Sequence, residues 1–201
     1  MTKIKRAIKR QLRVYRYVFY KETLVDFREH FWSFIGAFIG IASIALLSTL
    51  QFSGVVPVFL IGSFGASAVL VYGAIQSPLA QPRNLLLGHV VSAIIGVTVA
   101  KLLPDSLWLS AALAVALSIV GMQIARCLHP PGGATALIAV TGGEQISSLG
   151  YSYVLFPVLA GAILLLSVAL IFNNITKNRH YPIKKSRLRR SRRRELKKRF
   201  Q

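Results

Sequence analysis

Residues 126–138, Arg-Cys-Leu-His-Pro-Pro-Gly-Gly-Ala-Thr-Ala-Leu-Ile, bring together the groups needed to handle a small anion. Arg126 supplies a fixed positive charge, His129 can donate hydrogen bonds or carry a proton, and Thr135 adds a hydroxyl. The Pro and Gly residues at 130–133 interrupt regular backbone hydrogen bonding. Inside a membrane, such an interruption is tolerated only where the backbone is buried in protein or lines a polar cavity. The alternative is a kinked loop between two helices.

The composition places this stretch in a membrane protein. Of the 201 residues, 54% are hydrophobic, and the charges are concentrated at the two ends. Residues 1–28 hold nine Lys or Arg against two acidic residues, and residues 177–201 hold thirteen against one. The stretch between them carries only three basic and three acidic side chains, which is too few for a soluble domain. We therefore expect an integral membrane protein, and its single Cys127 has no partner for an intrachain disulfide.

Six apolar segments can be recognised along the chain, and the fifth begins within the central motif. They run over residues 31–51, 55–75, 85–103, 107–125, 132–142 and 153–172. Four are close to the ~20 residues that a membrane-spanning helix needs. The second segment is interrupted by Pro57, Gly62 and Gly65, and the fifth is short and follows Pro130 and Pro131. We expect these two to be a broken helix and a half helix in an all-α, polytopic membrane bundle.

The two irregular segments resemble each other. Residues 65–71, Gly-Ala-Ser-Ala-Val-Leu-Val, lie 68 positions before residues 133–139, Gly-Ala-Thr-Ala-Leu-Ile-Ala. The same offset pairs segment three with segment six and segment one with segment four, so we infer two three-element repeats over about 31–103 and 107–172. Three crossings per half would invert the repeats, and two would leave them parallel. The positive-inside rule favours inversion, because it places Arg83 and Arg126 in cytoplasmic loops with both basic tails.

An inverted repeat with broken helices predicts a substrate site near the membrane midplane, where the half-helix N-termini meet. Helix N-termini offer unpaired N–H groups and partial positive charge, which suit a small anion. The expected substrate-binding residues are Gly65, Ala66, Ser67, Gly132, Gly133, Ala134 and Thr135. For Ser67 and Thr135 the alternatives are bonding to the preceding helical turn or close helix packing. We expect no catalytic residues, metal or cofactor, because no acidic residue lies in the six segments and no enzyme motif is present.

A second polar cluster at residues 77–89 would line the route to this site. The residues that we assign to the pathway or its vestibule are Gln81, Arg83, Asn84, His89, Arg126 and His129. Arg83 and Arg126 would concentrate anions at the cytoplasmic mouth. His89 would face the pore, and His129 either faces it or anchors the loop. For Asn84 the structural alternative is an N-cap at the start of segment three.

The sequence resembles the HPP family of integral membrane proteins. The resemblance rests on Leu128 to Leu137, on Gly62 to Ser67, and on Ser77 to Asn84 followed by Gly88 and His89, and it covers roughly residues 30–175. It implies a membrane transporter with about four transmembrane helices, and it makes nitrite the leading substrate. This chain carries a basic tail where some relatives carry regulatory domains.

The sequence therefore predicts three parts. Residues 1–29 form a basic amphipathic helix on the inner leaflet, residues 30–175 form the transmembrane domain, and residues 176–201 form a disordered basic cytoplasmic tail. We expect a bacterial inner-membrane transporter or channel for a small anion, not an enzyme, with both termini cytoplasmic. Because no pair of acidic residues inside the membrane suggests proton or sodium coupling, we expect facilitated permeation through the site formed by the half-helix N-termini. Its expected partners are anionic lipids and further copies of itself, and not nucleic acid. A carrier for a neutral or weakly acidic molecule and a non-transporting scaffold remain as alternatives.

Overall fold

The computed structural model describes residues 27–51, 60–176 and 179–183, and all regular structure within these ranges is helical. The elements are α2 (Phe27–Gln51), α3 (Gly62–Ala68), the π-helical turn η2 (Val69–Gly73), the 3-10 turn η3 (Pro78–Ala80), α4 (Pro82–Leu102), α5 (Leu107–Ile124), α6 (Pro130–Thr141), α7 (Gly143–Ser147), the π-helical turn η4 (Val154–Leu159) and α8 (Ala160–Phe172). The predicted amphipathic helix at 1–29 lies outside the described residues, except for 27–29, which begin α2.

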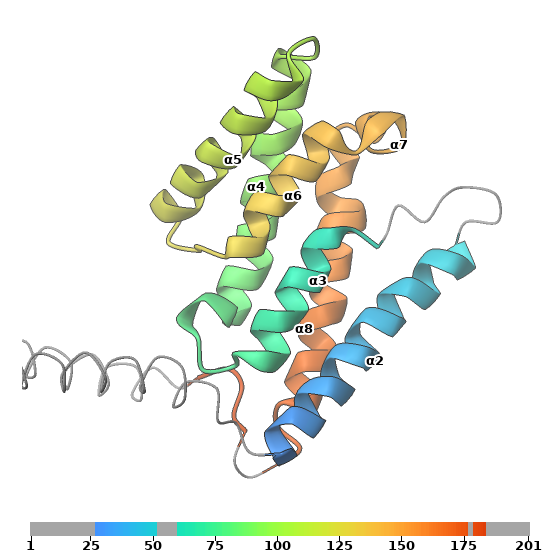
Figure 1. The fold of residues 1–201 in the computed structure, drawn as a ribbon, viewed down its shortest axis with the longest axis vertical. Coiled ribbons are helices and arrows are strands. Elements are labelled where there is room, and N and C mark those ends of the chain that lie inside the picture. The colour runs from blue at the N-terminus through green and yellow to red at the C-terminus, as the bar shows by residue number, and fades with distance from the viewer. Residues whose placement is uncertain (1–26, 52–59, 177–178, 184–201) are drawn as a thin grey trace, which may run out of the picture.

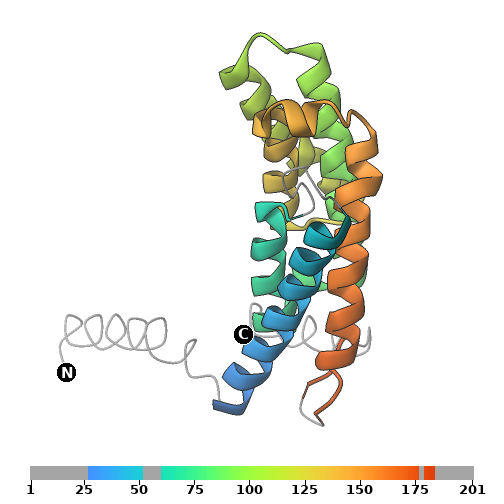
Figure 2. The same cartoon turned by 90° about the vertical axis from the view of Figure 1, so that its right-hand side faces the viewer.

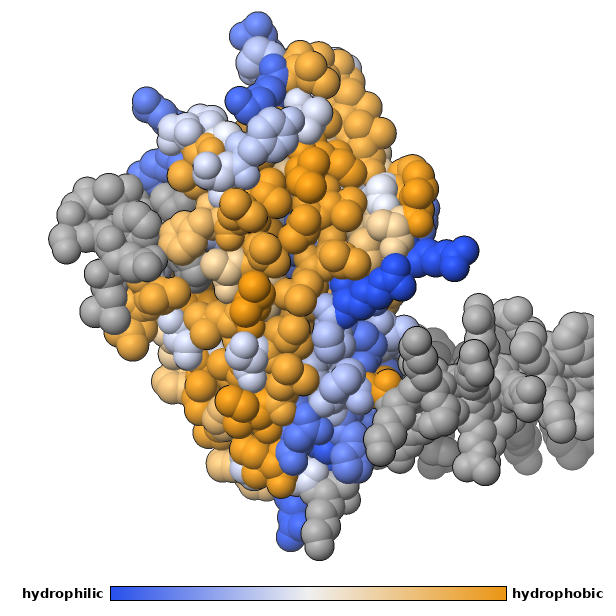
Figure 3. All heavy atoms as spheres, turned by 180° about the vertical axis from the view of Figure 1, so that it is seen from behind, coloured by the Kyte–Doolittle hydropathy of each residue, from blue (hydrophilic) through white to orange (hydrophobic). Residues whose placement is uncertain are grey.

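Four of these helices are long and apolar enough to cross a membrane. The four spans are Phe27–Thr49, Pro82–Leu102, Leu107–Ile124 and Val154–Phe172. Many of their apolar side chains face outward, as Phe34 and Phe38 do on α2, with 65% and 62% of their surface exposed. The broad hydrophobic face in Figure 3 is the surface that such side chains make. The predicted all-α membrane bundle is confirmed, and its hydrophobic exterior is suited to lipid.

The helices alternate in direction, and two of them are short. In Figure 1, α2, α4 and α6 run upward, whereas α3, α5 and α8 run downward. Helix α3 occupies the lower half of the bundle and α6 the upper half, so both begin near mid-height (Figures 1 and 2). Their first residues, Gly62 and Pro130, are separated by the same 68 positions that relate the sequence segments. This alternation is what inverted repeats require, although the equivalence of the two halves stays a prediction.

Aromatic side chains fix the short α3–η2 segment between α2 and α8. A Cβ added at Gly161 of α8 would overlap Cζ of the buried Phe64 ring, so only glycine lets that ring approach the helix so closely. Tyr72 packs on Gly36 and Gly40 of α2 in the same way, and its hydroxyl donates to the Leu165 carbonyl at 3.1 Å. The small pair Gly36 and Gly40 therefore serves internal packing. The expected homo-oligomer stays a prediction.

Helix α6 lies directly against the backbone of α4 because small residues line the contact. Gly88, Ser92 and Gly96 recur every four residues on α4 and so share one face. A Cβ added at Gly96 would lie 2.6 Å from the Ala136 carbonyl oxygen, and one added at Gly132 would lie 2.9 Å from the Gly88 carbonyl oxygen. This close approach brings the beginning of α6 to the second turn of α4.

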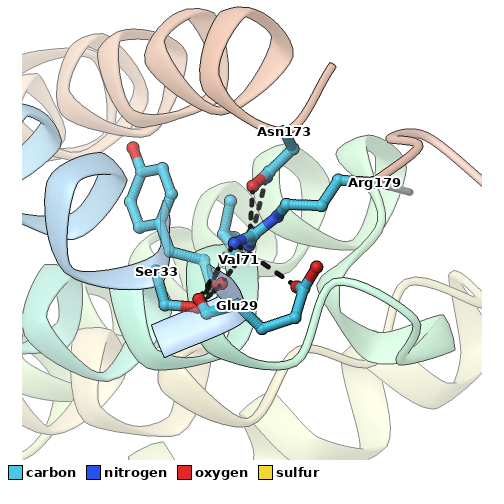
Figure 4. A network of polar contacts seen from close by, with 6 residues as sticks. Glu29, Ser33, Val71, Asn173 and Arg179 are labelled. Carbon is cyan, nitrogen blue, oxygen red and sulfur yellow. Dashed lines mark hydrogen bonds and ion pairs between the residues drawn. The ribbon is translucent and has the colours of Figure 1, made fainter. Parts of the chain in front are cut away.

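The first described part of the C-terminal tail is packed, which corrects our expectation of disorder from residue 176 onward. Arg179 is only 1% exposed, and its guanidinium lies among α2, η2 and the end of α8 (Figure 4). Its Nη2 donates to the Tyr72 carbonyl at 2.6 Å and to Asn173 Oδ1 at 3.1 Å, and its Nη1 lies 3.6 Å from Glu29 Oε2. A charge can be buried here because each partner satisfies part of it.

Two further hydrogen bonds join residues 179–183 to the helical bundle. The Tyr181 hydroxyl donates to the Ala80 carbonyl at 2.7 Å, and the Ile183 N–H donates to Gln81 Oε1 at 2.9 Å. The start of α2, the end of α8 and the segment before α4 are thereby joined at one end of the bundle. Residues 184–201 of the predicted tail lie outside the described residues.

Candidate functional site

Four uncharged polar side chains meet inside the bundle and form what we call the histidine chain: Thr135 of α6, His89 of α4, Ser67 of α3, and His129 just before α6. Each of the four is 0% exposed. Residues from three separate parts of the sequence thus form one sealed polar group among apolar helices. Ionisable side chains in such a place are costly, and they commonly mark a functional site.

The contacts within the histidine chain are short enough for good hydrogen bonds. Thr135 Oγ1 lies 2.7 Å from His89 Nδ1, and His89 Nε2 lies 2.8 Å from Ser67 Oγ. Ser67 Oγ also lies 3.0 Å from His129 Nε2. The Nδ1 atom of His129 lies 2.8 Å from the Leu79 carbonyl oxygen, which can only accept a hydrogen bond, so His129 carries a hydrogen on Nδ1.

Packing around the rings holds this geometry in place. The two imidazole centroids are 5.1 Å apart and the Phe64 ring lies edge-on to His89 at 5.6 Å. A Cβ added at Gly88 would lie 2.5 Å from the Cβ of His129, so this glycine makes room for the second ring. The Tyr153 hydroxyl donates to the Thr135 carbonyl at 3.1 Å and fixes the first turns of α6 from the η4 side.

The predicted substrate-binding residues divide between two faces of the short helices. Ser67, Gly132 and Thr135 are buried and face the centre of the bundle. Gly65 and Ala66 are exposed, and Gly133 and Ala134 are partly exposed. A Cβ at Gly133 would meet only Val115 of α5, at 3.8 Å. The structure thus brings the hydroxyl residues of the prediction together with the two histidines, and places Gly65 and Ala66 away from them.

The beginning of α6 offers fewer backbone donors than a typical helix N-terminus. Pro130 and Pro131 have no N–H, and the Gly132 N–H donates to the His129 carbonyl at 2.8 Å. The expectation that this helix end offers unpaired N–H groups to an anion is therefore met only in part. Hydroxyl and imidazole groups therefore provide most of the polar contacts available here.

Three of the predicted vestibule residues, Arg83, Asn84 and Arg126, lie at the corner between α5 and α6. Arg83 is exposed and its Nη2 donates to the Ala125 carbonyl at 3.0 Å, which places it beside the exposed Arg126. Arg126 has a φ of 53°, the left-handed turn that redirects the chain after α5. Gln81 donates through Nε2 to the carbonyls of Ile75 and Ser77. These contacts hold the loops in position.

One expectation for this cluster is wrong. Helix α4 begins at Pro82 with Gln81 as its N-cap, so Asn84 lies inside the first turn and does not cap it. Its Nδ2 instead donates to the Leu128 carbonyl at 2.7 Å, across to the segment before His129. Proline at the first helical position displaced the boundary by fixing φ without needing a hydrogen-bond partner.

Sequence comparison identifies the family to which the chain belongs. Residues 22–182 match the family model described as HPP, transmembrane region. Two transmembrane proteins of Dictyostelium discoideum are similar to the chain, at 48% and 44% identity over 161 residues, or 79% of this chain. The match covers 51% and 56% of those proteins, so the chain spans about half the length of the curated relatives it matches. No solved structure matches it.

Proposed function

We propose that this chain, which belongs to the HPP transmembrane family, is a membrane transporter for a small anion, with nitrite as the leading substrate. The observation that carries the proposal is the histidine chain: four fully buried polar side chains at the level where two half helices begin. Its hydroxyl and imidazole groups can donate hydrogen bonds to an anion that passes between α3 and α6.

The distribution of charge supports an anion rather than a cation. Within the four spans the one acidic residue is Glu29, at the beginning of α2 and beside Arg179. Arg83 and Arg126 lie together at the corner between α5 and α6, and no acidic side chain of the four spans lies beside them. In this proposal the two arginines form a vestibule that concentrates anions at the approach to the histidine chain.

The buried chain also implies a conformational cycle. Because no member of the histidine chain is exposed, transport through it would require α3 and α6 to separate in turn toward each side. The matched relatives come from Dictyostelium, so a bacterial inner membrane and the absence of enzymatic activity remain predictions of the sequence.

The test is uptake by purified protein in liposomes, with the membrane voltage clamped by a potassium gradient. We expect nitrite to enter faster than chloride, and both to enter faster than a neutral solute such as urea, relative to protein-free liposomes. Faster entry of the neutral solute would indicate the neutral-molecule carrier. No entry of any solute, with folded protein in the liposomes, would favour the scaffold.

A further inference from the structure

The histidine chain can be drawn with two complete sets of hydrogen bonds. In the neutral set, Thr135 donates to His89 Nδ1, His89 Nε2 donates to Ser67, and Ser67 donates to His129 Nε2. His129 Nδ1 donates to the Leu79 carbonyl in either set. Every hydrogen of the chain then has an acceptor, and both imidazoles are neutral.

The second set contains one proton more. A proton added to His89 Nδ1 allows the Nε2–H bond of His89 to break and its proton to pass to Ser67 Oγ. Ser67 passes its original proton to His129 Nε2. His89 now donates through Nδ1 to Thr135, whose hydroxyl turns to the Pro131 carbonyl at 3.3 Å. All hydrogen bonds are again complete, and His129 carries the added charge.

Among the residues that the structure describes, this added charge has no counter-ion. The groups facing the two rings are Ser67 and Phe64 from α3, Thr135 from α6 and the Leu79 carbonyl. The titratable neighbours beyond them are Tyr153, bound to the Thr135 carbonyl, and Cys127, whose carbonyl lies beside Gly88. Within the described residues, no charged side chain is hydrogen-bonded or ion-paired to the histidine chain.

A buried cation without a partner costs several kcal/mol, and an adjacent anion removes most of that cost. Building on the anion transport proposed above, we propose that the histidine chain takes up one proton together with each anion. The anion balances the imidazolium, and the imidazolium strengthens the hydrogen bonds to the anion. Transport is then the electroneutral movement of an anion with a proton, and a pH gradient drives it.

The experiment measures nitrite entry and internal pH together. Liposomes containing the protein and an entrapped pH-sensitive dye receive external nitrite, with the voltage clamped at two values, and protein-free liposomes give the background from nitrous acid crossing the lipid. Proton coupling predicts internal acidification that matches nitrite entry and does not change with voltage. This wild-type result does not depend on how any variant folds.

Variants then assign the proton path. Ser67→Ala removes the link between the rings and keeps both imidazoles, so it abolishes the coupled acidification. Ser67→Thr restores a hydroxyl and recovers it. Ser118→Ala is the control, because this fully buried hydroxyl on α5 bonds only to the Val115 carbonyl and should leave the flux unchanged. Coupled flux that survives in Ser67→Ala overturns the relay.

The outcomes separate the two proposals. Voltage-driven nitrite entry without acidification overturns proton coupling and leaves anion transport standing. No anion entry overturns both. Acidification matched to nitrite entry, lost in Ser67→Ala and retained in Ser118→Ala, supports both.

Discussion

Adding one methyl group at Gly132 should weaken the packing of α6 against α4, whereas the same change at Gly133 should not. A Cβ at Gly132 would lie 2.6 Å from Ser92 Oγ, 2.9 Å from the Gly88 carbonyl oxygen and 2.9 Å from Met122 Sδ. The serine and methionine can turn aside, but the carbonyl belongs to the α4 backbone. A Cβ at Gly133 would meet only Val115 Cγ1, at 3.8 Å, an ordinary contact distance.

The expected magnitudes follow from two opposing effects. Alanine is favoured over glycine inside a helix by about 0.5–1 kcal/mol, and overpacking costs about 1–3 kcal/mol. Gly133→Ala should therefore be neutral or slightly stabilising, and Gly132→Ala should lose roughly 1–2 kcal/mol. For a chain of this size each kcal/mol moves the thermal midpoint by about 2–4 °C.

The assay is thermal unfolding of the two variants and the wild type in the same detergent, followed by tryptophan fluorescence. Because the substitutions are identical and adjacent, differences in helix propensity or in detergent binding cancel. Equal midpoints for Gly132→Ala and Gly133→Ala would refute the backbone-to-backbone contact between α4 and α6. The position of His129 against α4 would then need another explanation.

Two further substitutions test the lower half of the bundle by the same unfolding assay. Arg179→Met should lose about 3 kcal/mol, since it leaves Asn173 Oδ1 without its buried donor and removes one of the two donors to the Tyr72 carbonyl, the other being Ser33. Arg83→Met, at an exposed arginine, should change stability little, and similar effects of the two substitutions would contradict the buried position of Arg179. Phe64→Ala should lose about 3–5 kcal/mol because the buried ring fills the space over Gly161. The control Phe34→Ala, at a ring with 65% of its surface exposed, should lose far less. An unchanged thermal midpoint in Phe64→Ala would show that α3 does not pack on α8 as described.

The transmembrane architecture could be predicted from sequence because one physical constraint dominates it. Backbone groups in lipid must bond within a helix, so apolar length alone identified all four spans. Prolines and glycines identified the two short helices for the same reason. The predicted boundaries were less accurate, as the start of α4 at Pro82 shows, because the apolar pattern begins later than the helix itself.

The candidate site was predicted as separate residues and not as a connected group. Ser67, His89, His129 and Thr135 were each named from their own surroundings. Their mutual contacts depend on Gly88, Ser92 and Gly96 allowing α6 to reach α4, which is a property of the folded bundle. The recurrence of small residues every four positions on α4 was the available signal. Arg179 was missed because it lies in a C-terminal segment with thirteen Lys and Arg, where composition alone cannot identify one buried guanidinium.

The prolines before α6 connect the two proposals about the site. A helix end rich in free N–H groups could hold an anion through fixed dipoles alone, and it would need no proton. Here Pro130 and Pro131 provide no N–H, and the Gly132 N–H is already bonded to His129. At the α6 side, positive charge for an anion then has to come from side chains, and the groups in the sealed centre that can acquire it by protonation are the two imidazoles. Reduced backbone donation and a protonatable side-chain pair therefore favour the same mechanism, in which the anion and its proton move together.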